Sequence, residues 1–143
     1  MRGRHSQEPE ALAKLEAYMK EIRLSPVGKP FYRYFNDDQI IPEVDILWEV
    51  GYPVPEGSSV RSPFEIKRLE GGLEAYSEFE CASDEAIVYY WSAALRAMRR
   101  GFFAIGYPTV IQTANPDKGR IFVEVRMLVR KKRPNYQNLP VFY

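Results

Sequence analysis

The chain has 143 residues, which suits one domain of ordinary size, and 45% of them are hydrophobic, enough for a real core. Its formal net charge of +1 does not indicate general attraction to nucleic acid or to an anionic membrane. A single cysteine and a single histidine exclude an internal disulfide and a zinc cluster. With no membrane-length apolar run and no signal-like N-terminus, we expect a cytoplasmic protein without metal or cofactor.

The first predicted element is a helix that begins at Pro9, a residue suited to a first helical position. Leu12, Leu15 and Met19 follow at helical spacing. The helix is expected to end near Leu24, because the next residues are Ser25 and Pro26.

A strand rich in aromatic residues follows, in the stretch GKPFYRYF at residues 28–35. Side chains alternate along a strand, so Phe31 and Phe35 share one face and Tyr32 and Tyr34 share the other. We expect the two phenylalanines to face the helix-covered core and the two tyrosines to face a ligand cleft.

The next predicted strand covers residues 44–54 and contains Trp48, Glu49 and Tyr52. Trp48 and Tyr52 share a face, where core packing and stacking on a ligand are both open for Trp48. Glu49 lies on the other face. It is either an ordinary exposed carboxylate or, if the cleft opens there, the counter-charge of a cationic ligand.

The second half of the chain is predicted to hold one helix and three strands. A strand within residues 64–81 bends at Gly71-Gly72 and precedes a helix from Ser83 to Gly101. Strands at residues 109–113 and 120–129 complete this half. The expected apolar stripe of the helix is Ile87, Trp91, Ala94, Leu95 and Met98.

The two halves repeat one unit of strand, helix, strand and strand. Tyr32 coincides with Val110 and Tyr34 with Gln112 at an offset of 78 (110 − 32 = 78), while Met19 is laid over Met98. The repeats cover about 9–55 and 63–130, followed by a tail at 131–143. The first unit lacks its opening strand. The fold class is therefore α+β, an antiparallel sheet with two main helices, a central cleft and one open edge through which a homodimer could form.

The chain resembles the GyrI-like small-molecule-binding domains, which include gyrase-inhibitor-like proteins and the effector-binding domains of multidrug-responsive transcription regulators. The segments that carry the resemblance are PVGKPFYRY (26–34), WEVGYPV (48–54), LEGGLEAY (69–76), and GYP (106–108) with Asn115-Pro116. The resemblance implies a concave aromatic pocket for bulky, often cationic compounds. It also implies a buried Glu, the suspected acid of hydrolytic members, at the position of Val110, and a Tyr two residues later at the position of Gln112; this chain has neither.

The leading hypothesis is a binding module that captures a bulky aromatic or cationic small molecule, with no catalytic residue assigned and no direct nucleic-acid or membrane binding. The predicted ligand-binding residues are Tyr32, Tyr34, Trp48, Glu49, Tyr52, Tyr90, Trp91, Tyr107 and Gln112. One alternative is a hydrolase of reactive cyclopropane-type compounds that uses Glu49 and Glu124. Another is a protein-interaction module that pairs through the open edge.

Overall fold

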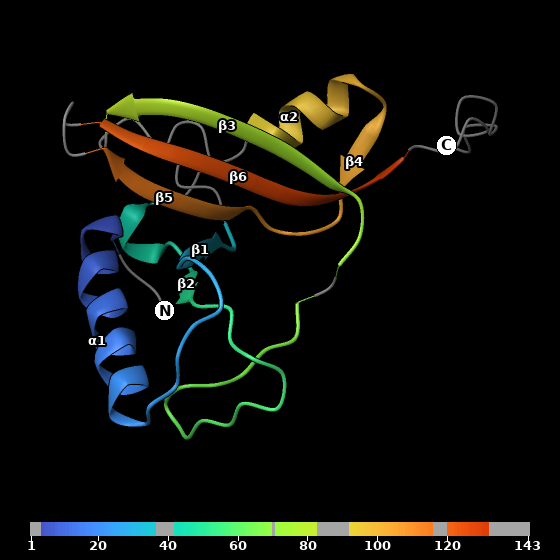
Figure 1. Ribbon diagram of the computed structural model, residues 1–143. Coiled ribbons are helices and arrows are strands. Elements are labelled where there is room, and N and C mark those ends of the chain that lie inside the picture. Colours follow the sequence, from blue (N-terminus) through green and yellow to red (C-terminus); the bar gives the residue numbers. More distant parts are fainter. Residues whose placement is uncertain (1–3, 37–41, 70, 83–91, 116–119, 132–143) are drawn as a thin grey trace.

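A computed structural model describes residues 4–36, 42–69, 71–82, 92–115 and 120–131 (Figure 1). Its helices and strands are α1 (Glu8–Glu21), β1 (Phe31–Tyr34), β2 (Trp48–Gly51), β3 (Glu74–Ala82), α2 (Ser92–Arg99), β4 (Phe102–Ala104), β5 (Thr109–Asn115) and β6 (Arg120–Lys131). Short 3-10 turns lie at His5–Gln7 and Glu43–Asp45. The predicted α+β class, with an antiparallel sheet and two helices, is confirmed.

The sheet has the strand order β2-β1-β5-β6-β3, and the short β4 pairs with the end of β6. Its register follows the internal repeat. Tyr32 lies opposite its repeat counterpart Val110, at the contact between the two halves. Tyr34 pairs with Trp48 in the first half, and Gln112 pairs with Val123 in the second. An approximate twofold axis therefore passes between β1 and β5.

One face of the sheet carries both helices and the core. Tyr32, Tyr34 and Trp48 are buried there together with Val110 and Val123. Residue Ala11 of α1 and residue Ala93 of α2 join the same core cluster. Burial of these apolar side chains is the main favourable term for folding.

The predicted orientation of the aromatic strand is wrong. Tyr32 and Tyr34 are the buried residues of β1, whereas Phe31 and Arg33 are only half-buried on the opposite face. One reason is Glu8 of α1, whose carboxylate accepts a hydrogen bond from the buried Tyr34 hydroxyl. The helix-covered face can thus accept phenols that a purely apolar core would exclude.

The predicted apolar stripe of the second helix is confirmed at Ala94 and wrong at Leu95 and Met98. Leu95 and Met98 are 58% and 53% exposed, and the buried residues of α2 are Ala93, Ala94 and Ala97. Met98 is therefore exposed, whereas Met19, the residue laid over it in the repeat, is buried. Residues 83–91, which include the predicted site residues Tyr90 and Trp91, lie outside the described residues.

Several element boundaries differ from the prediction. β2 is four residues long because Pro53 has no N–H to extend the ladder, and β3 begins only after Gly71-Gly72. The pairing of β4 with β6 was not predicted. No strand precedes α1 among residues 4–7, and no described strand pairs with the outer edge of β2. The tail from Lys132 onward lies outside the described part of the chain.

Candidate functional site

Two tyrosines of β1 and the tyrosine that follows β2 lie near two glutamates of α1. We call this group the tyrosine–carboxylate cluster: Tyr32, Tyr34, Tyr52, Glu8 and Glu16. The Tyr34 hydroxyl donates a buried hydrogen bond to Glu8 Oε1 at 2.7 Å. The Tyr52 hydroxyl donates to Glu16 Oε1 at 2.5 Å. Two phenol–carboxylate hydrogen bonds therefore join α1 to the sheet.

The spacing of the cluster follows from helix and strand geometry. Glu8 and Glu16 are eight residues apart on α1, a rise of about 12 Å at 1.5 Å per residue. Trp48, which pairs with Tyr34, and Tyr52 are four residues apart, or about 13 Å along an extended chain. The two lengths agree, so one helix can satisfy both hydroxyls.

Two tyrosines of the cluster resist ionisation. Burial raises the pKa of Tyr32 to about 12, with smaller contributions from the negative charges of Glu8 and Glu16. Burial, followed by the hydrogen bond and charge of Glu16, raises the pKa of Tyr52 to about 12 as well. Both hydroxyls therefore stay protonated at neutral pH, and that of Tyr52 donates its hydrogen bond to Glu16.

The cluster has an enclosed part and an accessible part. Trp48 and Tyr34 are 0% and 2% exposed, so the core interpretation of Trp48 is the one that the structure favours. Tyr32 is also buried, at 8%. Tyr52 is half-buried and Glu16 is exposed. A ligand approaching from solvent would therefore meet Tyr52 and Glu16 first.

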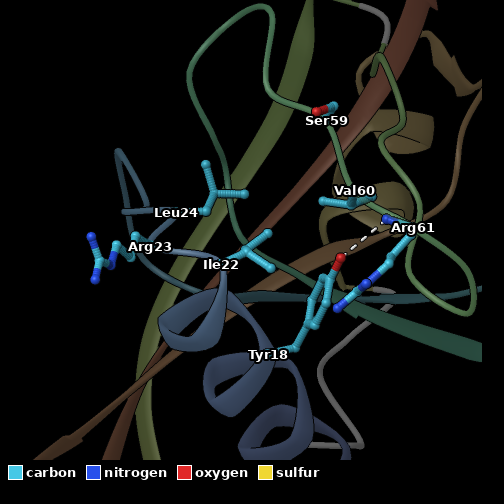
Figure 2. A pocket seen from close by; sticks show the side chains of 7 residues that line it. All are labelled: Tyr18, Ile22, Arg23, Leu24, Ser59, Val60 and Arg61. Carbon is cyan, nitrogen blue, oxygen red and sulfur yellow. Dashed lines mark hydrogen bonds between the residues drawn. The ribbon is translucent and has the colours of Figure 1, made fainter.

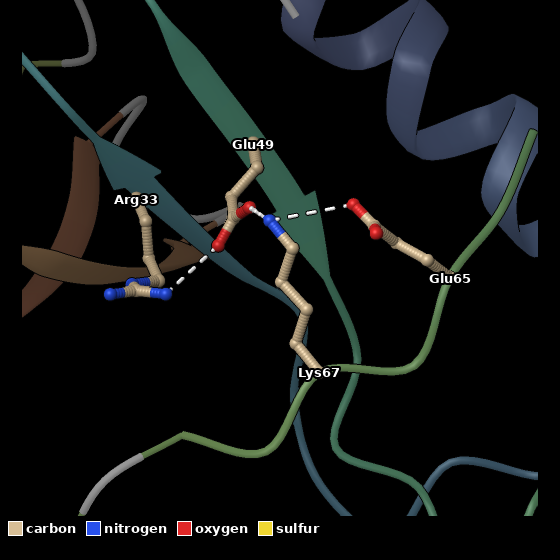
Figure 3. Close-up of polar contacts among 4 residues, drawn as sticks. All are labelled: Arg33, Glu49, Glu65 and Lys67. Atoms are coloured by element: carbon tan, nitrogen blue, oxygen red, sulfur yellow. Dashed lines mark hydrogen bonds and ion pairs between the residues drawn. The ribbon is translucent and has the colours of Figure 1, made fainter.

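Glu49 lies on the other face of the sheet and is already paired (Figure 3). Its carboxylate contacts Arg33 Nη1 at 3.0 Å and Lys67 Nζ at 2.6 Å. Lys67 also contacts Glu65 at 3.5 Å. The hydrogen bond to Glu49 is the main cause of a raised Lys67 pKa. Since two cations neutralise Glu49, it does not serve the cluster as a counter-charge.

Two further predicted ligand-binding residues, Tyr107 and Gln112, are not members of the cluster. Tyr107 is 46% exposed and packs edge-to-face against Phe35, with ring centroids 5.0 Å apart. Gln112 is half-buried on the helix-covered face, in register with Val123. The structure therefore brings Tyr32, Tyr34, Trp48 and Tyr52 together, and it places Glu49 and Tyr107 elsewhere.

The sequence analysis missed Glu8 and Glu16. A signal was present, because both lie on the helical stripe that also carries Leu12, Leu15 and Met19. A charged residue in an apolar stripe indicates a buried polar partner. Only the packing of α1 against the tyrosines shows that their hydroxyls are the partners of Glu8 and Glu16.

A surface hollow of about 470 Å³ lies between the end of α1 and the loop that follows β2 (Figure 2). Tyr18 forms part of its wall. The ring of Tyr18 stacks on Phe64 at 4.1 Å, and its hydroxyl accepts a hydrogen bond from the Arg61 amide at 3.0 Å. The hollow contains none of the predicted ligand-binding residues.

The described residues limit the chemistry further. They contain no group of three or more His, Cys, Asp or Glu side chains placed to hold a metal ion. Neither described helix has the length and apolar character needed to cross a membrane.

No protein-family model matches the chain, and no curated protein matches it either. The resemblance to GyrI-like domains stays a prediction from the motifs.

Proposed function

We propose that the protein binds an organic cation with an aromatic body at the accessible side of the tyrosine–carboxylate cluster. The observation that carries this proposal is the convergence of tyrosine rings and two carboxylates on one face of the sheet. Aromatic faces attract cations, and a nearby carboxylate adds charge complementarity. The resemblance to GyrI-like effector-binding domains supports the same ligand class.

The cluster assigns different roles to its members. Tyr52 and Glu16 would contact the ligand, because they are the members open to solvent. Glu16 accepts one hydrogen bond from Tyr52 through Oε1, and a carboxylate has further lone pairs for a ligand cation. Trp48 and Tyr34 would hold the site rigid from below rather than stack on the ligand.

Binding accounts for the cluster better than hydrolysis does. The raised pKa values of Tyr32 and Tyr52 make both hydroxyls poor bases and poor nucleophiles near neutral pH. Any acid–base role would fall on the two glutamates. A ligand that is recovered intact after prolonged incubation would support binding alone.

The proposal is tested by titrating the protein with rhodamine 6G, a cationic aromatic dye, and following its fluorescence anisotropy. Saturable binding is expected, and Glu16→Gln is expected to weaken it about fivefold through the loss of one charge contact. Glu10→Gln is the matched control, because it removes the same charge from α1 at a residue paired only with Lys14 on the surface.

Two results would contradict the proposal. One is the absence of saturable binding by folded wild-type protein across a panel of aromatic cations. The other is an equal effect of Glu16→Gln and Glu10→Gln, which would mean that only the overall charge matters. Circular dichroism of each variant establishes that it is folded.

A further inference from the structure

A second cavity lies between α2 and β3, away from the tyrosine–carboxylate cluster. Its volume is about 260 Å³, and most of its lining is apolar. The buried part of the lining includes Ala93 and Ala97 of α2 and Val129 of β6. Pockets for drug-sized ligands fall at about 300 to 1,000 Å³, so this one suits a smaller molecule.

Charged side chains line the exposed part of the cavity. Arg96 comes from α2, Arg100 directly follows the end of α2, and Glu74 comes from the start of β3. These three residues give the lining a net charge of +1 (2 − 1 = 1). Neither arginine side chain forms an ion pair or hydrogen bond among the described residues.

Among the described residues, several other cations have carboxylate partners, which Arg96 and Arg100 lack. Arg33, Lys67 and Arg126 each contact a glutamate. Two unpaired guanidinium groups at an apolar cavity provide donors for a carboxylate or sulfonate. An apolar body of the same ligand would be buried against the alanines and Val129.

We propose that this cavity binds a small amphipathic anion: a carboxylate or sulfonate carried on a short alkyl chain or a single aromatic ring. Arg96 and Arg100 hold the anionic group, and the space next to Ala93 and Ala97 holds the apolar group. The site is independent of the proposed organic-cation site, since the two share no residue. Its ligand has the opposite charge.

The test uses octanoate as the probe and the amide NMR spectrum of the full chain as the readout. Saturable shifts are expected around the cavity, at residues 73–76 and 93–102. The variant Arg96→Gln/Arg100→Gln is expected to weaken octanoate binding about fivefold to tenfold, through the loss of two partly exposed charge contacts. Octyltrimethylammonium, which has the same chain length and the opposite charge, is expected to give no saturable shifts there.

The matched control is Arg99→Gln/Arg130→Gln. It removes the same total charge from the same end of the molecule, but neither residue lines the cavity. Ala97→Phe, which fills the cavity, is expected to abolish binding. If this variant fails to fold, the comparison of the two double arginine variants still decides the outcome.

Three outcomes would overturn the proposal. If both double variants weakened octanoate binding equally, the effect would come from the overall charge and not from the cavity. If octyltrimethylammonium bound as tightly as octanoate, the arginines would not recognise the anionic group. Octanoate binding seen only after removal of residues 132–143 would assign the cavity to a segment of the chain itself.

The two proposed sites are tested separately, because loss of rhodamine binding in Glu16→Gln would leave the octanoate result unchanged.

Discussion

The two halves of the sheet fill the space beneath their helices in different ways. In the first half, the strands bury Tyr32, Tyr34 and Trp48. Helix α1 contributes both apolar side chains and carboxylates to this region. Under α2 the equivalent strand residues are Val110, Gln112 and Val123. The helix contributes mainly alanines there. Rings and hydrogen bonds therefore fill the core of the first half, and its surface hollow of about 470 Å³ lies at the end of α1. The second half has the cavity between α2 and β3, which Val110, Gln112 and Val123 do not line.

This difference shows that one repeated backbone plan can support two kinds of site. The register is the same in both halves, because Tyr34 pairs with Trp48 as Gln112 pairs with Val123. Only side-chain size and polarity differ. Large rings need polar partners for their hydroxyls, while small side chains leave unfilled volume.

The largest predicted effect tests whether the first half carries more of the core energy. Trp48→Ala is expected to lower the free energy of unfolding by about 3 to 5 kcal/mol, because it removes a fully buried ring. Val123→Ala, at the repeat counterpart, is expected to cost about 2 kcal/mol. Urea unfolding of both variants measures the difference. Equal losses would contradict the asymmetry between the halves.

The second prediction concerns the buried hydrogen bond that joins α1 to β1. Tyr34→Phe removes the donor to Glu8 and is expected to cost about 1 to 3 kcal/mol, because a buried carboxylate loses a partner. Tyr76→Phe is the control, since Tyr76 is 49% exposed. Its loss is expected to be near zero in the same urea experiment. A Tyr34→Phe variant as stable as wild type would show that Glu8 does not need this hydroxyl.

The third prediction is a loss of stability in alkali. The pKa values of Tyr32 and Tyr52 are about 12 in the folded protein, above the ordinary value of 10.0. Between about pH 10 and 12 the unfolded chain releases these protons and the folded chain keeps them. Stability is therefore fully present below pH 10 and falls as pH rises through this window.

Absorbance at 295 nm, followed as pH is raised, measures this titration. Tyr32 and Tyr52 are expected to ionise late, and Tyr52→Phe is expected to remove one of these late steps. A wild-type curve in which every tyrosine ionises near pH 10 would argue against the cluster.

The smallest predicted effect lies on the opposite face of the sheet. Lys67→Met removes one of the two cations that contact Glu49, yet Lys67 is 47% exposed. The expected cost is up to about 1 kcal/mol, and it is expected to shrink at high salt. Arg33→Met is expected to cost more, because the Arg33 side chain is only 18% exposed. The reverse order would mean that burial does not control these two contacts.

The sequence alone determined the α+β class, the two helices and the correspondence between the strands of the two halves. That the counterparts Tyr32 and Val110 pair across β1 and β5 came from the structure. Periodicity, helix termini and the internal repeat are local features, and they survive in any packing that buries the apolar residues. It also indicated that the aromatic residues of the first half would gather in one region, as Tyr32, Tyr34, Trp48 and Tyr52 do.

Only the tertiary structure decided which face of β1 is buried and where the charges are satisfied. Alternation assigns Tyr32 and Tyr34 to one face, but only the packing of α1 onto the sheet shows that this face is buried and that Glu8 accepts the Tyr34 hydrogen bond. The pairing of Glu49 with Arg33 and Lys67 likewise depends on segments far apart in the chain. The sequence can mark a charged residue in an apolar stripe, but it does not identify the partner, because each partner is fixed by how the helices and loops pack onto the sheet.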